Sequence, residues 1–137
     1  MENKEGLIWY DGNLVDWKDA KLHVLTHGLH YASSVFEGER SYSGRIFKLH
    51  EHTERLLYSA SELDFEIPYS IDEIKQASYL TLEKNNLVDA YIRPIAWRGA
   101  ETVGVSAQNT KIHFAIAVWE WPSSVSYTHL RAHETLD

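Results

Sequence analysis

The order of the hydrophobic patterns along the chain constrains its fold more than any other feature. Short strand patterns occupy residues 7–17 and 35–49, two helical patterns follow, and two longer strand patterns come last. Strands and helices are therefore grouped along the chain rather than strictly alternating. This grouping predicts an α+β domain, a two-layer sandwich of a mostly antiparallel sheet with helices on one face.

Turn residues separate the short strands. Asp11-Gly12-Asn13 predicts a hairpin turn, because Asp-Gly tolerates positive φ angles, and Ser43-Gly44 predicts a second turn. The strands are expected at Leu7 to Tyr10, Leu14 to Trp17, Val35 to Ser41 and Arg45 to Leu49.

Two helices are expected between residues 49 and 84. The first is indicated by apolar residues at helical spacing, namely Leu49, Leu56, Leu57, Ala60 and Leu63, and Pro68 closes this unit. Ser70 and Glu73 form a capping-box pattern, in which each side chain satisfies a free backbone N–H group. The second helix should therefore begin after Ser70 and run to about Lys84.

The segments "DAYIRPIAW" and "KIHFAIAVWEW" predict two longer strands, separated by a polar loop from Gly99 to Thr110. Pro94 lies inside the first of them. Because proline has no N–H group to donate to a strand ladder, we expect Pro94 at a sheet edge or a bulge.

Composition excludes several classes of function. The chain has 137 residues, a net charge of −7 and no Lys/Arg run, which argues against nucleic-acid binding. It has no cysteine, and so no disulfide or thiol chemistry. The N-terminus does not have the pattern of a signal peptide, and no apolar run is long enough to span a membrane. A cytoplasmic protein is the expectation.

The stretch "YASSVFEGER" predicts an unusual strand face. Strand periodicity places Phe36, Gly38 and Arg40 on one face with Tyr42, and the opposite face carries Glu37 and Glu39 among others. A cation beside aromatics and a glycine gap suits a small anion with an apolar side chain. The alternative is an edge strand whose charges face water.

Arg93 shares a strand face with Tyr91 in "YIRP". Together with Arg40 it could form a carboxylate clamp, since guanidinium binds carboxylate through two parallel hydrogen bonds. Two ordinary surface ion pairs are the alternative, worth ~0–1 kcal/mol each.

Histidines and acidic residues offer weaker candidates. His23, His27 and His30 have helical spacing, but Gly28 interrupts them, so no metal site is predicted. His50 and His52 lie at a helix start and are expected to be solvated or capping groups. Glu37 and Glu39 share a strand face, but no neighbouring residue supports an acid/base pair for hydrolysis.

Three motifs, taken together and in order, carry a family resemblance. They are "HYASSVFEG" with Arg40 close behind, "HTERL" and "YIRP". With their flanking segments they resemble the N-terminal domain of branched-chain amino acid aminotransferase, a fold-type IV enzyme that uses pyridoxal 5'-phosphate. The resemblance covers about Leu7 to Trp121.

The resemblance implies roles for nine residues. Arg55 matches the arginine that contacts the cofactor phosphate. Tyr31 matches a residue that contributes to the neighbouring subunit's site. Arg93 matches an arginine that helps to bind the distal carboxylate of glutamate. The complete set of implied substrate-binding residues is Tyr31, Phe36, Gly38, Arg40, Tyr91, Arg93, Val105 and Trp121. Glu39 departs from the family, which usually has an apolar residue there, and we expect little effect because it should point away from the pocket.

The resemblance also implies a transamination between branched-chain amino acids and 2-oxoglutarate, in a homo-oligomer of at least two subunits. The lysine that forms a Schiff base with the cofactor lies beyond this chain in the family, so the chain alone is expected to be inactive. D-Amino acid aminotransferase and aminodeoxychorismate lyase, which share the fold, are alternatives. A non-catalytic module that binds a small ligand or a metal is a further one.

The end of the chain differs from the rest. "SYTHLRAHET" resembles translated sequencing-adapter read-through and follows a strong strand directly. We therefore expect residues 1–123 to form the N-terminal α+β domain and residues 124–137 to be a non-native tail, with a C-terminal domain missing. Phe36, Tyr42, Tyr91 and Trp121 would then leave an apolar face that promotes aggregation.

Overall fold

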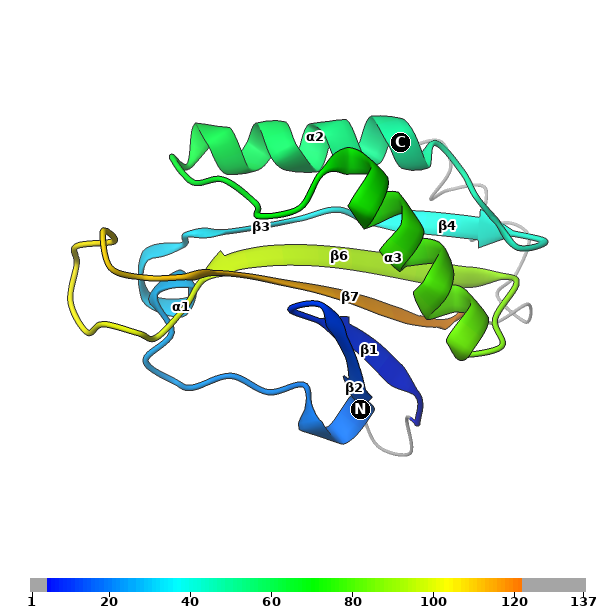
Figure 1. Ribbon diagram of the computed structural model, residues 1–137, viewed down its shortest axis with the longest axis horizontal. Helices are drawn as coiled ribbons and strands as arrows, with labels where there is room; N and C mark the ends of the chain where they lie inside the picture. Colours follow the sequence, from blue (N-terminus) through cyan, green and yellow to red (C-terminus); the bar gives the residue numbers. More distant parts are fainter. Residues whose placement is uncertain (1–4, 122–137) are drawn as a thin grey trace, which may run out of the picture.

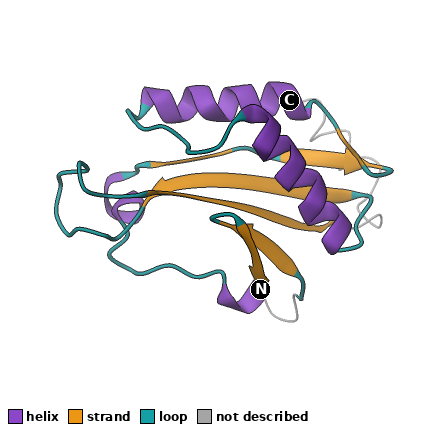
Figure 2. Ribbon diagram, in the orientation of Figure 1, coloured by secondary structure: helices purple, strands orange, loops and turns teal. Residues whose placement is uncertain are grey.

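The computed structural model describes residues 5–121, and a seven-stranded sheet runs through them (Figures 1 and 2). The strand order is β2-β1-β7-β6-β4-β5, β3 also pairs with β6, and each of these pairings is antiparallel. The strands are β1 (Leu7–Tyr10), β2 (Asn13–Asp16), β3 (Ser34–Phe36), β4 (Glu39–Tyr42), β5 (Arg45–Ile46), β6 (Ala90–Arg98) and β7 (Ile112–Glu120).

Two helices cover one face of this sheet (Figure 1). Helix α2 (Leu49–Glu62) contacts β3, and helix α3 (Ile71–Lys84) crosses β7 and β1. The core between the layers contains Leu56, Ile74 and Phe114, each at most 1% exposed. The predicted fold class, an α+β sandwich with helices on one face, is confirmed.

Local signals placed α3 correctly. The Ser70 hydroxyl accepts from the Glu73 N–H at 3.1 Å, and the Glu73 carboxylate accepts from the Ser70 N–H at 2.9 Å. The hairpin turn also forms as expected, with Asp11 and Gly12 at φ angles of 49° and 98°. The polar loop at residues 99–110 contains neither helix nor strand.

The predicted strand from Val35 to Ser41 is wrong, because the structure divides it into β3 and β4 at residues 37–38. The pairing register with β6 is the same on both sides of the interruption, with Phe36 opposite Ile95 and Glu39 opposite Ile92. Side chains therefore keep their alternation through the break.

Pro94 lies inside the central strand β6, so its predicted edge or bulge position is also wrong. It faces the interruption, where the Pro94 carbonyl accepts from the Glu37 N–H at 3.0 Å. The N–H group that proline lacks would point to this same side, where the neighbouring strand is already interrupted. The sheet therefore accommodates proline without a bulge.

Three smaller differences concern the connections. The returning strand expected from Arg45 to Leu49 is only β5, because Lys48 has a φ of 54° and α2 begins at Leu49. A 3-10 turn, η1 (Trp17–Asp19), and a short helix, α1 (His27–Tyr31), were not expected.

Within residues 5–121 no helix is long and apolar enough to cross a membrane. The predicted tail at residues 124–137 lies outside the described residues.

Candidate functional site

The sheet face opposite α2 and α3 carries the predicted arginine–aromatic cluster. Phe36 and Tyr42 are exposed there, whereas Glu37 and Glu39 are buried on the helix side. This confirms the alternation expected from the sequence. Arg40 pairs directly with Tyr91 of the adjacent strand.

Arg93 is held between two aromatic side chains. Its guanidinium carbon lies 4.2 Å from the Phe36 ring centroid, and Nη2 donates to the Tyr91 hydroxyl at 2.6 Å. Arg93 Nε is buried and makes no hydrogen bond within residues 5–121. Because a buried guanidinium donor favours an acceptor, this atom is suited to binding an anion.

Arg40 occupies a similar position one strand away. Its guanidinium carbon lies 4.7 Å from the Trp121 ring centroid and 5.1 Å from that of Tyr42, and its Nε is likewise buried without a hydrogen bond in the described chain. Tyr91 continues the aromatic row, with its ring 5.7 Å from Trp121. The cluster can therefore offer cationic donors and apolar walls to one small molecule.

Gly38 lies beside this cluster, and its missing side chain makes room for Tyr91. A Cβ atom at Gly38 would overlap the Tyr91 hydroxyl and lie 3.1 Å from the ring carbon that bears it. In this structure the gap above Gly38 thus admits the hydroxyl that receives the Arg93 hydrogen bond.

On the helix side, Glu37 forms a network that the sequence did not indicate. Its carboxylate accepts from Arg55 Nε and Nη2, each at 2.8 Å, and from His52 Nδ1 at 2.7 Å. Burial alone would raise the pKa of Glu37, but the Arg55 and His52 hydrogen bonds and charges outweigh it and lower the pKa. His52 is therefore not the solvated or capping group expected. The sequence signal for this network was the spacing of three residues between His52 and Arg55, which places both side chains on one helix face.

Glu39 points away from the cluster, as expected, but it enters the core. It is 2% exposed, and neither carboxylate oxygen has a hydrogen-bond partner in the described part of the chain. Burial, with a smaller contribution from the Glu37 charge, raises the pKa of Glu39 to about 8. The neighbouring glutamates therefore differ at neutral pH, Glu37 being charged and Glu39 neutral. The expected direction of Glu39, away from the pocket, is confirmed, and its small effect on the pocket stays a prediction.

Tyr31 and Val105 do not join the open-face cluster. His27 connects them at the opposite end of the sheet, where α1 and the 99–110 loop lie (Figure 1). His27 Nε2 donates to the Val105 carbonyl at 3.0 Å, its Nδ1 lies 2.6 Å from the Ser33 hydroxyl, and its ring centroid is 4.6 Å from that of Tyr31. Tyr31 and Val105 are 46% and 75% exposed, so both face outward.

The three histidines of the candidate metal motif bind other partners. His23 accepts from the Leu25 N–H, and His30 donates to the Val24 carbonyl. Among residues 5–121 no group of three or more acidic, histidine or cysteine side chains is arranged to hold a metal ion.

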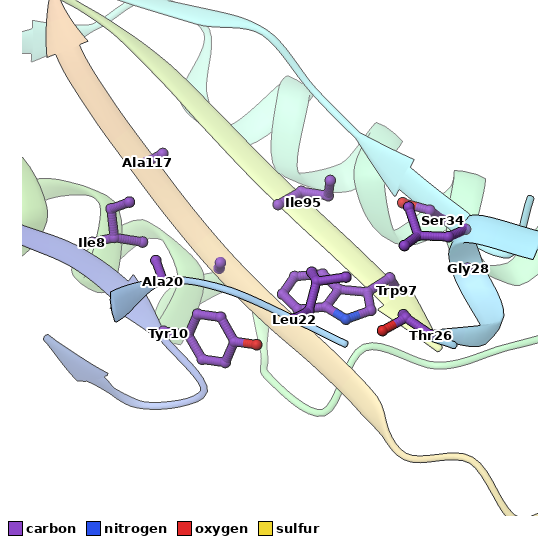
Figure 3. Close-up of a pocket in the computed structure, with 12 residues that line it drawn as sticks. Ile8, Tyr10, Ala20, Leu22, Thr26, Gly28, Ser34, Ile95, Trp97 and Ala117 are labelled. Carbon is purple, nitrogen blue, oxygen red and sulfur yellow. The ribbon is translucent and has the colours of Figure 1, made fainter. Parts of the chain in front are cut away.

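A cavity of about 240 Å³ lies on the same open face but near β1 (Figure 3). Figure 3 shows Tyr10, Trp97 and Leu22 around it, together with Ile8 and Ile95. Among residues 5–121, none of the predicted site residues and no arginine lines this cavity. Its apolar lining does not suit the binding of a carboxylate or phosphate.

These features match a known family. The family model for amino-transferase class IV matches residues 34–135. The chain belongs to the class IV aminotransferase family.

Individual relatives narrow the comparison. The branched-chain-amino-acid aminotransferase of Pseudomonas aeruginosa is 49% identical over 125 residues, which are 88% of this chain and 41% of that protein. The chain thus spans about two fifths of the length of this relative.

Solved structures agree with the sequence comparison. The branched-chain amino acid aminotransferase of Escherichia coli superimposes with a TM-score of 0.83 and 39% identity, covering 90% of this chain and 42% of that one. A T.th. branched-chain amino acid aminotransferase complexed with N-(5'-phosphopyridoxyl)-L-glutamate gives a TM-score of 0.81 and 41% identity, covering 86% of this chain and 42% of that one. The predicted family resemblance is therefore confirmed.

Proposed function

We propose that this chain is the N-terminal part of a branched-chain amino acid aminotransferase that transfers the amino group between leucine, isoleucine or valine and 2-oxoglutarate. The single observation that carries this proposal is the pair Arg40 and Arg93, each packed on aromatic rings and each with a buried Nε that makes no hydrogen bond within the described chain. Such a site can bind an acidic substrate through charge and a branched one through its apolar walls.

The helix side supplies a group suited to pyridoxal 5'-phosphate. The Arg55 side chain is 66% exposed, and its guanidinium is held in place by Glu37. Arginine donors match the geometry of phosphate oxygens, so Arg55 would bind the cofactor phosphate. When bound, the cofactor supplies the electron sink for transamination. The T.th. relative was solved with a phosphopyridoxyl-glutamate compound, which combines both ligand chemistries.

Six of the implied substrate-binding residues have a defined role in this proposal. Arg93 and Arg40 orient the distal carboxylate of glutamate, and Phe36 and Tyr91 form the wall against an apolar side chain. In a homo-oligomer of at least two subunits, Tyr31 and Val105 reach the neighbouring subunit's site, which their outward position supports. We further propose a cytoplasmic location.

Kinetics of the full-length gene product test the assignment. Arg93→Met should raise the KM for glutamate and 2-oxoglutarate much more than the KM for leucine. Phe36→Ala should do the reverse, because it removes apolar contact area and no charge. If both variants changed the two KM values in parallel, the division between charge and apolar wall would be wrong.

The amino-donor profile separates the alternatives within the fold. A preference for D-alanine would indicate a D-amino acid aminotransferase, and release of pyruvate from aminodeoxychorismate would indicate the lyase. Binding of a keto acid or zinc by a full-length protein that shows no transamination would favour the non-catalytic module.

A further inference from the structure

Glu37 lies at a structural junction, and the proposed function uses its contact with Arg55 without assigning Glu37 itself a role in binding. It occupies the interruption between β3 and β4, and its side chain crosses to the helix layer, where it contacts Arg55 and His52. Its sequence neighbours Phe36 and Gly38 lie on the opposite, open face. Glu37 therefore connects the arginine assigned to the cofactor with the strand that carries the substrate cluster.

We propose that Glu37 is a positioning residue: its carboxylate, fixed by His52, holds the Arg55 guanidinium in the orientation that binds the cofactor phosphate. This inference rests on the proposed function, because the phosphate role of Arg55 belongs to that proposal. It adds a function for two side chains, Glu37 and His52, that the family resemblance did not assign.

The geometry favours positioning. A solvent-exposed arginine loses considerable rotamer entropy when it is ordered, and a partner that already orders it reduces this cost for the ligand. Glu37 engages Arg55 through two parallel hydrogen bonds of 2.8 Å, which define the plane of the guanidinium. His52 holds Oε1 at 2.7 Å, so the carboxylate itself is restrained from rotating.

Charge acts in the opposite direction. The Glu37 carboxylate is only 5% exposed and carries a negative charge that weakens the attraction between Arg55 and an anion. Because Arg55 is two-thirds exposed, water and salt screen this repulsion. Ordering of the guanidinium should therefore outweigh the repulsion, and the sign of a substitution effect distinguishes the two roles.

The Glu37 side chain can be altered without moving the open face. The Glu37 backbone is fixed by its N–H bond to the Pro94 carbonyl, which does not involve the side chain. Substitutions at Glu37 should thus change cofactor affinity while leaving the substrate KM at saturating cofactor near the wild-type value.

Two substitutions at Glu37 separate the effect of its charge from the effect of its side-chain length. Glu37→Gln keeps the length of the side chain and removes the charge, whereas Glu37→Asp keeps the charge and shortens the side chain by one methylene. Glu39→Gln is the matched control, since Glu39 is a neighbouring buried carboxyl with no hydrogen bond to Arg55. The full-length protein is titrated with pyridoxal 5'-phosphate and with pyridoxal, which lacks the phosphate, and the ³¹P shift of the bound cofactor is recorded.

Positioning predicts that both Glu37 variants raise the Kd for pyridoxal 5'-phosphate about tenfold, the factor expected from one lost charge-assisted hydrogen bond. The Kd for pyridoxal and the Glu39→Gln control should stay at the wild-type values, and the ³¹P shift should change. In this 137-residue chain, hydrogen exchange at Arg55 Nε should accelerate in both Glu37 variants, a readout that needs no cofactor.

Tighter binding in Glu37→Gln with unchanged binding in Glu37→Asp would show that Glu37 acts only through its charge and would overturn the inference. Wild-type affinity in both variants would also overturn it while leaving the proposed function intact. If the wild-type protein bound neither pyridoxal 5'-phosphate nor pyridoxal, the proposed function would fail first, and this inference with it. Circular dichroism of each variant verifies folding.

Discussion

Replacing Glu39 with glutamine should stabilise the chain relative to wild type, and the difference in the free energy of unfolding should grow as the pH rises. The raised pKa of Glu39 sets the size of this difference. Glu39 is fully enclosed between β4 and the helix layer, and its carboxyl has no hydrogen-bond partner among residues 5–121. Its pKa is raised to about 8 by burial and by the Glu37 charge, compared with 4.5 for an unperturbed glutamate.

The sign follows from proton linkage. Below pH 4.5 Glu39 is protonated in both the folded and the unfolded chain, so it adds no pH dependence. Between pH 4.5 and about 8 the unfolded chain releases this proton while the folded chain retains it. The free energy of unfolding then falls by about 1.4 kcal/mol per pH unit, reaching a loss of about 3 kcal/mol at pH 7 and about 5 kcal/mol above pH 8.

Urea unfolding of this chain, followed by tryptophan fluorescence from pH 4.5 to 9, measures the effect. Glutamine at position 39 is also a buried polar group, so its constant cost cancels when slopes are compared instead of absolute stabilities. The difference between Glu39→Gln and wild type should widen with rising pH and become constant above pH 8. Parallel curves would refute the reasoning, because Glu39 would then be ionised or paired in the folded state.

Glu37→Gln is the internal control of opposite sign. The pKa of Glu37 is lowered by Arg55 and His52, so its stabilising contribution is present above pH 4.5 and is lost as the pH falls through the lowered value. This variant should be less stable than wild type at neutral pH, and the difference should vanish in acid. Two neighbouring glutamates would then give pH profiles of opposite direction.

Three further changes test other parts of the structure. Ser70→Ala removes the capping box and should lower the free energy of unfolding by about 1 kcal/mol, measured by urea unfolding, with little change at a solvent-exposed serine used as control. His113→Asn should free the loop that carries Glu101, and amide hydrogen exchange in that loop should become faster. Burial lowers the pKa of His113, but hydrogen bonds to Asp11 and Glu101 outweigh it and raise the pKa. The stability lost in the variant should therefore be largest below pH 6.5 and should fade as the pH rises through the raised pKa of His113. Gly38→Ala should displace the Tyr91 ring and lower the free energy of unfolding by about 1–3 kcal/mol, which should also lower the melting temperature. An unchanged melting temperature and an unchanged Tyr91 environment would contradict the close contact between Gly38 and Tyr91.

The elements that the sequence predicted well are those governed by local rules. The capping box fixed the start of α3, and period-two alternation placed Phe36 and Arg40 on the face opposite the helices. The division of one predicted strand into β3 and β4 could not be foreseen, because it depends on which residue of a distant strand lies opposite. Pro94 faces that interruption only through the pairing of β6 with its neighbours.

The same distinction applies to the site. Arg40 and Arg93 were predicted together because both follow strand alternation on neighbouring strands. Glu37 was not linked to Arg55, since their contact joins the interruption between β3 and β4 to a helix residue 18 positions later and depends on how α2 lies along the sheet. The direction of Glu39 was predicted from strand alternation, but its burial was not, because alternation does not give the depth to which α2 and α3 cover that face.

The contrast between Glu37 and Glu39 also decides whether they could act as an acid/base pair. Such a pair needs both carboxyl groups within reach of one substrate. Both lie on the helix side, one bound by Arg55 and His52 and the other enclosed in the core, while the exposed aromatic rings and the buried arginine donors lie on the opposite face. The charge of Glu37 is therefore committed to holding a cation, and the proton of Glu39 is not accessible to a substrate. Neither glutamate is therefore placed to act as an acid or a base on a substrate bound at the open face.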